Sequence, residues 1–366
     1  MKNIVISLLI LFSFDACIEN SIQEPVTIKS EEYNKFSYQV DTILIMTPGT
    51  IREFPYLFPS FNYSDPIFAG LDERTNLITI YDSETLSIKD TIQLYYTGPH
   101  AIQGNMVGSI WYHNPDSIFI LQHVPNRLMI VNSKAEITWE KNLKDIFQSK
   151  SEINGLFAYG LFDRVGLYYN DDKVYFALRQ NRARQDFLAP MIGYYDFENN
   201  DIHTIDIHYP EFYTMNQNVG IYKFPGITWL KNSIIIVLPH SPEIFIYDYK
   251  GKLQKHIEKI PGFNVGQIPK PGESSQSHLM NNPIYRIVQP IQNGDYFLFQ
   301  TQKNTPNNPD SEIYKSTVLF NRDFTKFSTV DINVKPISFG GEYFYYPIPP
   351  EQSEYQLMER YRIEME

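Results

Sequence analysis

The sequence has one cysteine, few basic residues, and no apolar run that is long enough to span a bilayer. Cys17 is the only cysteine among 366 residues, so a disulfide within the chain is excluded. Lys and Arg number 31 against 42 Asp and Glu, which gives a net charge of −11. Because nucleic acids are bound through clustered Lys and Arg, this acidic chain without a basic block is predicted not to bind them.

The familiar short motifs of catalysis and cofactor binding are also missing. The sequence contains no GxSxG, HExxH, Walker A, GxGxxG or EF-hand pattern. His100, His240 and His278 precede or link predicted strands and would share a metal only if these segments met, and no HxH or HxxxH spacing supports that. We therefore predict no catalytic residue, no metal and no cofactor.

The N-terminus has the features of an export signal. One positive charge in Met1–Asn3 precedes the apolar run Ile4–Phe14, which is too short for a membrane span. Cys17 then follows Ala16, as in a bacterial lipobox, although Asp15 departs from that pattern. We predict a lipoprotein signal peptide over 1–16, lipidation of Cys17 and a tether over 17–25. The chain would then be anchored in the bacterial envelope, at the outer membrane, on its periplasmic or surface face; a plain secretory signal is the alternative.

A β-hairpin pattern recurs along the rest of the chain. Each copy has a few apolar or aromatic residues, an Asp or Asn, a turn and a second alternating strand. The copies fall at 76–94, 128–143, 192–207, 244–260 and 317–332. A further pair of strand-like runs lies upstream of each hairpin, and four strands per unit are typical of a propeller blade.

The two ends of the chain each supply part of one more blade. Residues 26–43 read as an outer hairpin and residues 337–346 as an inner strand pair. We therefore predict an all-β, six-bladed propeller over 26–350, closed by pairing of its N- and C-terminal strands, with seven blades if an insertion hides one. The spacing of Tyr355, Met358 and Tyr361 predicts a short C-terminal helix over 351–366.

These features resemble a known family. The lipobox-like start, the chain length and the Tyr-Asp pairs before the turns resemble an uncharacterised lipoprotein family of Bacteroidota with a domain of unknown function. That family is similar in turn to six-bladed propellers of the TolB-like kind. The resemblance covers about residues 17–350, implies the fold and the envelope location, and carries over no active residue. Asp82, Asp196 and Asp248 are expected to cap turns.

Candidate ligand-binding residues gather where each innermost strand would begin, near one mouth of a central channel. Aromatic faces with a few cations suit sugars, peptides or an acidic group, and inter-blade packing is the alternative use of such residues. The candidates are His100, Tyr159, Tyr222, Lys223, His278, Tyr285, Arg286 and Tyr343.

Three functions remain open from the sequence. The leading hypothesis is a non-catalytic propeller that binds a protein, peptide or glycan at the cell envelope. The alternatives are a propeller-fold polysaccharide lyase or glycoside hydrolase, and a structural accessory of an envelope complex.

Overall fold

The computed structural model of the protein describes about three-fifths of the chain and is built from β-strands. The described ranges are 25–32, 36–46, 56–60, 67–72, 75–82, 85–102, 107–122, 124–143, 153–156, 166–180, 190–210, 225–239, 241, 243–258, 284–291, 294–305, 308–330, 338–340, 343–347 and 355–365. These ranges contain no helix long and apolar enough to cross a membrane.

The strands form six separate sheets. Sheet 1 contains β4 (Tyr56–Ser60), β5 (Ile67–Asp72), β6 (Leu77–Asp82) and β7 (Ile88–Gln93). Sheet 2 contains β8 (Val107–Asn114), β9 (Ser117–Gln122), β10 (Arg127–Val131) and β11 (Ile137–Asn142). Sheet 3 contains β12 (Ile153–Leu156), β13 (Tyr168–Asn170), β14 (Lys173–Gln180), β15 (Ile192–Asp196) and β16 (Asp201–Ile205).

The other three sheets each combine C-terminal strands with one N-terminal strand. Sheet 4 contains β17 (Gly226–Trp229), β18 (Ile234–Val237), β19 (Ile244–Tyr247), β20 (Leu253–Ile257) and β1 (Val26–Ile28). Sheet 5 contains β21 (Ile284–Ile291), β22 (Tyr296–Thr305), β23 (Asn308–Asn321), β24 (Lys326–Val330) and β2 (Glu31–Glu32). Sheet 6 contains β25 (Ser338–Gly340), β26 (Tyr343–Pro347), β27 (Tyr355–Met365) and β3 (Phe36–Met46).

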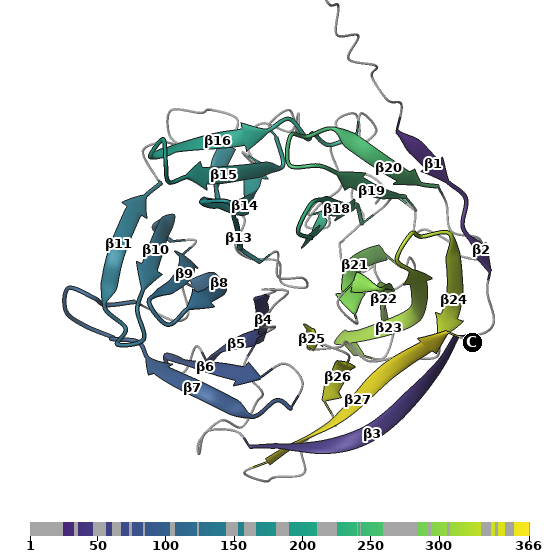
Figure 1. Ribbon diagram of the computed structural model, residues 1–366, viewed down its shortest axis with the longest axis horizontal. Coiled ribbons are helices and arrows are strands. Elements are labelled where there is room, and N and C mark those ends of the chain that lie inside the picture. The colour runs from purple at the N-terminus through teal and green to yellow at the C-terminus, as the bar shows by residue number, and fades with distance from the viewer. Residues whose placement is uncertain are drawn as a thin grey trace, which may run out of the picture.

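The sheets stand around a common centre like the blades of a propeller (Figure 1). Apart from the N-terminal strands β1, β2 and β3, which lie at the outer edges of sheets 4, 5 and 6, the chain starts each sheet at an innermost strand and moves outward through antiparallel neighbours. β4, β8 and β21 therefore lie inside, while β7 and β11 lie at the rim (Figure 1). Neighbouring innermost strands contact one another, as β4 does β8 and β25. The predicted propeller class is confirmed.

The two ends of the chain pair with each other, as predicted. β27 and β3 run antiparallel over their whole length, from Tyr355 opposite Met46 to Met365 opposite Phe36. The division of strands differs from the prediction, because the C-terminal part supplies three strands of sheet 6 and the N-terminal part only the outermost one. This pairing joins the first and last parts of the chain within one sheet (Figure 1).

The predicted C-terminal helix is wrong. Residues 355–365 form the strand β27. The spacing of three and four that suggested a helix coexists with a period of two, since Tyr355, Leu357, Tyr361 and Ile363 are separated by even numbers of residues. Pairing with β3 and β26 satisfies the backbone groups of this strand, and Ile363 is buried, so tertiary contacts select the period of two.

The N-terminal hairpin predicted over 26–43 is also wrong. β1 runs parallel to β20, β2 runs parallel to β24, and only β3 pairs with β27. The segment therefore runs along the outer edges of sheets 4 and 5 before it enters sheet 6 (Figure 1). Exposed sheet edges carry unpaired backbone groups, and β1 and β2 cover part of the outer edges of sheets 4 and 5.

The predicted turn role of Asp82, Asp196 and Asp248 is confirmed. The Asp82 carboxylate accepts a bond from the Thr85 amide at 2.9 Å, and Asp248 accepts bonds from the amides of Lys250 and Lys252 at 2.9 Å. Asn132, Asp196 and Asn321 cap their turns in the same way. These short side chains fix each tight turn by binding its own amide groups.

Candidate functional site

Three inner strands, β8, β12 and β21, have an irregular register, which bears on the expected binding face. In β21 the pairing with β22 shifts register between Tyr285 and Ile287, so Arg286 is the extra residue of a β-bulge. The same irregularity leaves Gly108 unmatched near the start of β8, and β12 shifts register between Ile153 and Leu156. Bulges bend a strand locally and are frequent beside binding sites, so these entrances are the first candidate site.

Tyr285 and Arg286 therefore lie where the sequence placed them, near the start of an innermost strand. Tyr343 does not. It opens β26, the second strand of sheet 6, and pairs with Gly340 at the end of β25. Because β26 runs antiparallel to β25, Tyr343 lies at the end of the sheet opposite the strand entrance, which corrects its expected position.

His100 contacts an outermost strand. Its Nδ1 accepts a bond of 3.0 Å from the amide of Ile137, the first residue of β11. The sequence suggested that His100 would face the mouth of the ring with other histidines, whereas this bond ties its ring to the outer strand of sheet 2. The contact gives His100 a role in holding the connection between sheets 1 and 2.

The remaining candidates lie outside the described residues. They are Cys17, Tyr159, Tyr222, Lys223, His240 and His278. Within the described part of the chain, no three His, Cys, Asp or Glu side chains are grouped so that they could hold a metal ion.

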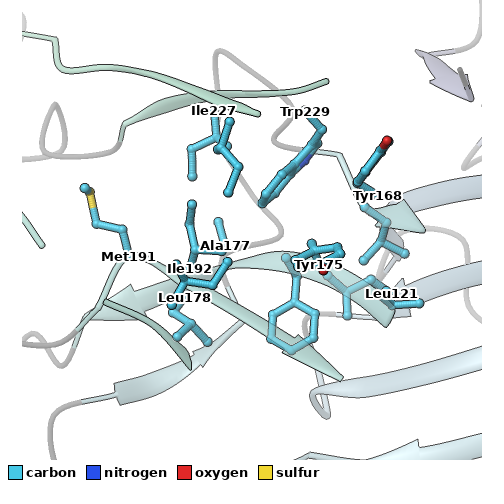
Figure 2. Close-up of a cluster of buried hydrophobic side chains, with 14 of the residues drawn as sticks. Leu121, Tyr168, Tyr175, Ala177, Leu178, Met191, Ile192, Ile227 and Trp229 are labelled. Carbon is cyan, nitrogen blue, oxygen red and sulfur yellow. The ribbon is translucent and has the colours of Figure 1, made fainter. Parts of the chain in front are cut away.

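Many aromatic residues do pack between sheets, as the alternative use of such residues required. Tyr168 of sheet 3 stacks on Trp229 of sheet 4 with ring centroids 6.3 Å apart, and Trp111 of sheet 2 meets Tyr168 edge-on at 5.1 Å. Tyr175 lies beside them in the same cluster (Figure 2). Burial raises the pKa of Tyr175 to about 12, because the apolar surroundings disfavour its charged form.

Polar side chains join neighbouring sheets near the centre, and no sequence pattern predicted them. The buried Ser109 hydroxyl of β8 accepts a bond of 2.7 Å from the amide of Leu167, beside β13. The Trp229 indole donates to the Gly166 carbonyl at 2.6 Å, and the Thr228 hydroxyl donates to the Val288 carbonyl of β21. Such bonds depend on which strands become neighbours, so no local pattern could have revealed them.

The connection from β7 to β8 is a second feature that the sequence analysis missed. Residues 95–99, Tyr-Tyr-Thr-Gly-Pro, are all exposed, with Tyr95 at 47% and Tyr96 at 54% of their full exposure. Leu94 and Ile102 at its two ends are buried. Two adjacent tyrosines directly after a strand and before Thr-Gly-Pro were the local signal that could have identified this loop.

The fold and the comparisons agree on the class of protein. The chain is a β-propeller, and its residues 30–289 match the family model described as a domain of unknown function, DUF4221. The chain therefore belongs to the DUF4221 family. No curated protein matches the sequence.

Two solved structures are similar over nearly the whole chain. A DUF4221 family member from Bacteroides vulgatus ATCC 8482 is 15% identical, with a TM-score of 0.65 over 91% of this chain and 99% of that one. A protein from Bacteroides fragilis NCTC 9343 is 8% identical, with a TM-score of 0.58 over 93% of this chain and 99% of that one, and its name describes it as a candidate exported protein. At these identities the likeness shows the fold alone.

Proposed function

We propose that the protein is a lipoprotein of the bacterial envelope, anchored through Cys17 at the outer membrane, and a non-catalytic binding module. Its six sheets act as six blades, in the manner of TolB-like propellers, and it binds a protein, peptide or glycan at the innermost strand entrances. The family membership, the lipobox-like start and the name of the Bacteroides fragilis relative support this proposal.

The observation that carries the proposal is the bulge at Arg286. A regular ladder would match this residue with a partner on β22, but the register passes from Tyr285 to Ile287 without it. A bulge at the start of an innermost strand costs ladder pairing and is frequent beside binding sites; β8 has one at its start, between Val107 and Ser109, and a second near its other end, between Tyr112 and Asn114. Arginine offers a planar fork that binds carboxylates and phosphates through two bonds, so we propose a ligand with an acidic group.

Replacing Arg286 with alanine tests this role. An oligogalacturonate and a Glu-rich peptide serve as acidic probes, and the melting temperature is recorded with and without each. We expect a probe to stabilise the wild type and to stabilise Arg286→Ala much less, while the melting temperatures of the two proteins without probe stay close.

Arg322→Ala is the matched control. Arg322 lies at the opposite end of sheet 5, is exposed, and pairs with Asp295 at 3.5 Å, so its loss should leave probe binding unchanged. If Arg286 instead belongs to a buried ion pair, its loss costs about 3–5 kcal/mol of stability. A sharp fall in melting temperature with probe binding intact would assign Arg286 to the scaffold.

The anchor is tested by Cys17→Ala. Without the thiol no lipid can be attached, so the variant should move from the membrane fraction to the soluble envelope fraction. Unchanged fractionation would contradict the anchoring proposal and leave the binding proposal standing.

A further inference from the structure

The loop 95–99 presents two half-exposed tyrosines beside an open stretch of backbone, with the Tyr95 ring 6.5 Å from the His100 ring. Tyr95 and Tyr96 are among the few large hydrophobic side chains that are exposed in the described part of the chain. Gly98 has a φ of +91°, and no atom lies within 4 Å of the place that a Cβ would take there. The exposed part of each tyrosine and the backbone at Gly98 are therefore accessible to a bound molecule.

The loop is held in place from both ends. The buried side-chain amide of Asn76 donates to the carbonyls of Leu94 and Ile102, at 3.2 and 2.6 Å. The Ile102 amide donates to the Tyr95 carbonyl at 2.9 Å. The Arg127 guanidinium donates to the Ala101 carbonyl at 3.2 Å, and His100 accepts from Ile137. A loop that is already ordered loses little conformational entropy on binding.

The loop also lacks formal charge in a strongly acidic protein. Residues 94–102 contain no Lys, Arg, Asp or Glu. Arg127, the cation that contacts the loop, also bonds to Gln122 and forms an ion pair with Glu140 at 3.1 Å. A charged ligand would therefore find no uncommitted counter-charge within the loop itself.

We propose that the loop 95–99 is a binding surface for a neutral saccharide chain, separate from the innermost strand entrances. Tyrosine rings provide rigid, amphipathic contact surface on which the apolar face of a sugar ring packs, while hydroxyl and backbone groups meet its polar rim. A typical protein interface buries about 800 Å² per partner, which five residues cannot supply, so a small neutral ligand fits this surface better than a protein.

Calorimetry with the full chain tests the proposal. The probes are cellohexaose, maltohexaose and mannohexaose, with an oligogalacturonate as the acidic comparison. We expect at least one neutral hexasaccharide to bind, and its Kd to rise about tenfold or more in the double variant Tyr95→Ser/Tyr96→Ser. Tyr95→Phe/Tyr96→Phe keeps the rings and should bind within about threefold of the wild type.

Two further variants separate the rings from the scaffold. Ile88→Ser removes an exposed apolar side chain from the same sheet, at 38% exposure, and should leave binding unchanged. Asn76→Ala keeps both rings but releases the ends of the loop, so it should weaken binding and lower the melting temperature together.

The outcomes also distinguish this site from the one proposed at Arg286. Arg286→Ala should bind the neutral sugar as the wild type does. The proposal is overturned if none of the three neutral hexasaccharides binds, if the Tyr→Ser double variant binds as well as the wild type, or if only the oligogalacturonate depends on Tyr95 and Tyr96. Each of these results leaves the entrance site to be judged by its own test.

Discussion

Removing the last strand should open the ring. Truncation before Gln352 deletes β27, which pairs with β3 along 11 residues. An antiparallel ladder has on average about one backbone hydrogen bond per residue pair, each with a net value of about 0.5–1.5 kcal/mol. The bonds lost to β3 alone amount to about 5–15 kcal/mol, which equals the whole stability of a typical domain, and the bonds lost to β26 add to this.

The truncation leaves β26 and β3 in sheet 6 without the strand that joins them. We expect the truncated protein to aggregate or to lose its cooperative thermal transition, measured by circular dichroism and size-exclusion chromatography. A synthetic peptide of residues 352–366, added during refolding, should restore a monomer with a cooperative transition.

Deletion of residues 1–32 is the matched control. It removes β1 and β2, which pair over only three and two residues, and keeps β3. This variant should stay monomeric with a lowered melting temperature. If the C-terminal truncation also stays monomeric and melts where the intact chain does, the pairing of β27 with β3 does not hold the ring together.

Two further predictions concern buried polar groups. Ser109→Ala leaves the Leu167 amide buried without its acceptor, so it should lower the free energy of unfolding by about 1–3 kcal/mol, measured by chemical denaturation. Ser133 is exposed, so Ser133→Ala is the control and should leave the free energy of unfolding unchanged. Equal effects of the two substitutions would contradict the role of Ser109 in joining the sheets. Burial raises the pKa of Tyr81, Tyr169 and Tyr175 to about 12 from 10.0, so the folded state favours their neutral forms. The stability that these three neutral tyrosines contribute is complete below pH 10 and is lost as the pH rises toward about 12. The melting temperature should therefore fall between pH 10 and about 12, while the absorbance of these tyrosinates appears only near the upper end of that range. A constant melting temperature over this pH range would refute the prediction.

The sequence predicted the parts of the fold that depend on local pattern. The hairpin around Asp82, the strand Ser117–Gln122 and the turn at Asp248 all follow from alternation and turn chemistry within a few residues. Pairing between distant segments was harder to predict. β1 and β2 are too short to show a period of two, and each forms a strand only because it pairs with a distant segment, β1 with β20 and β2 with β24.

The same limit explains the errors at the C-terminus and at the site. Residues 355–365 carry both a helical and a strand period, and only the presence of β3 decides between them. Tyr343 was expected at a strand entrance, but it opens the second strand of the inner pair, so it lies at the opposite end of the sheet. Asn76, which lies 18 residues before Leu94, holds the loop by a hydrogen bond to the Leu94 carbonyl. The exposure of Tyr95 and Tyr96 depends on this distant contact, so the local sequence showed only that two tyrosines are adjacent.

Hydrogen–deuterium exchange of the full chain shows whether ligands bind at the innermost strand entrances. The acidic probe that stabilises the wild type most is added at saturation, and amide exchange is compared with that of the free protein. We expect slower exchange at the starts of β8 and β21, around Gly108 and Arg286, and this protection should disappear in Arg286→Ala. Protection confined to the opposite ends of the sheets, such as the turn around Asp295, or no change at either entrance, would contradict it.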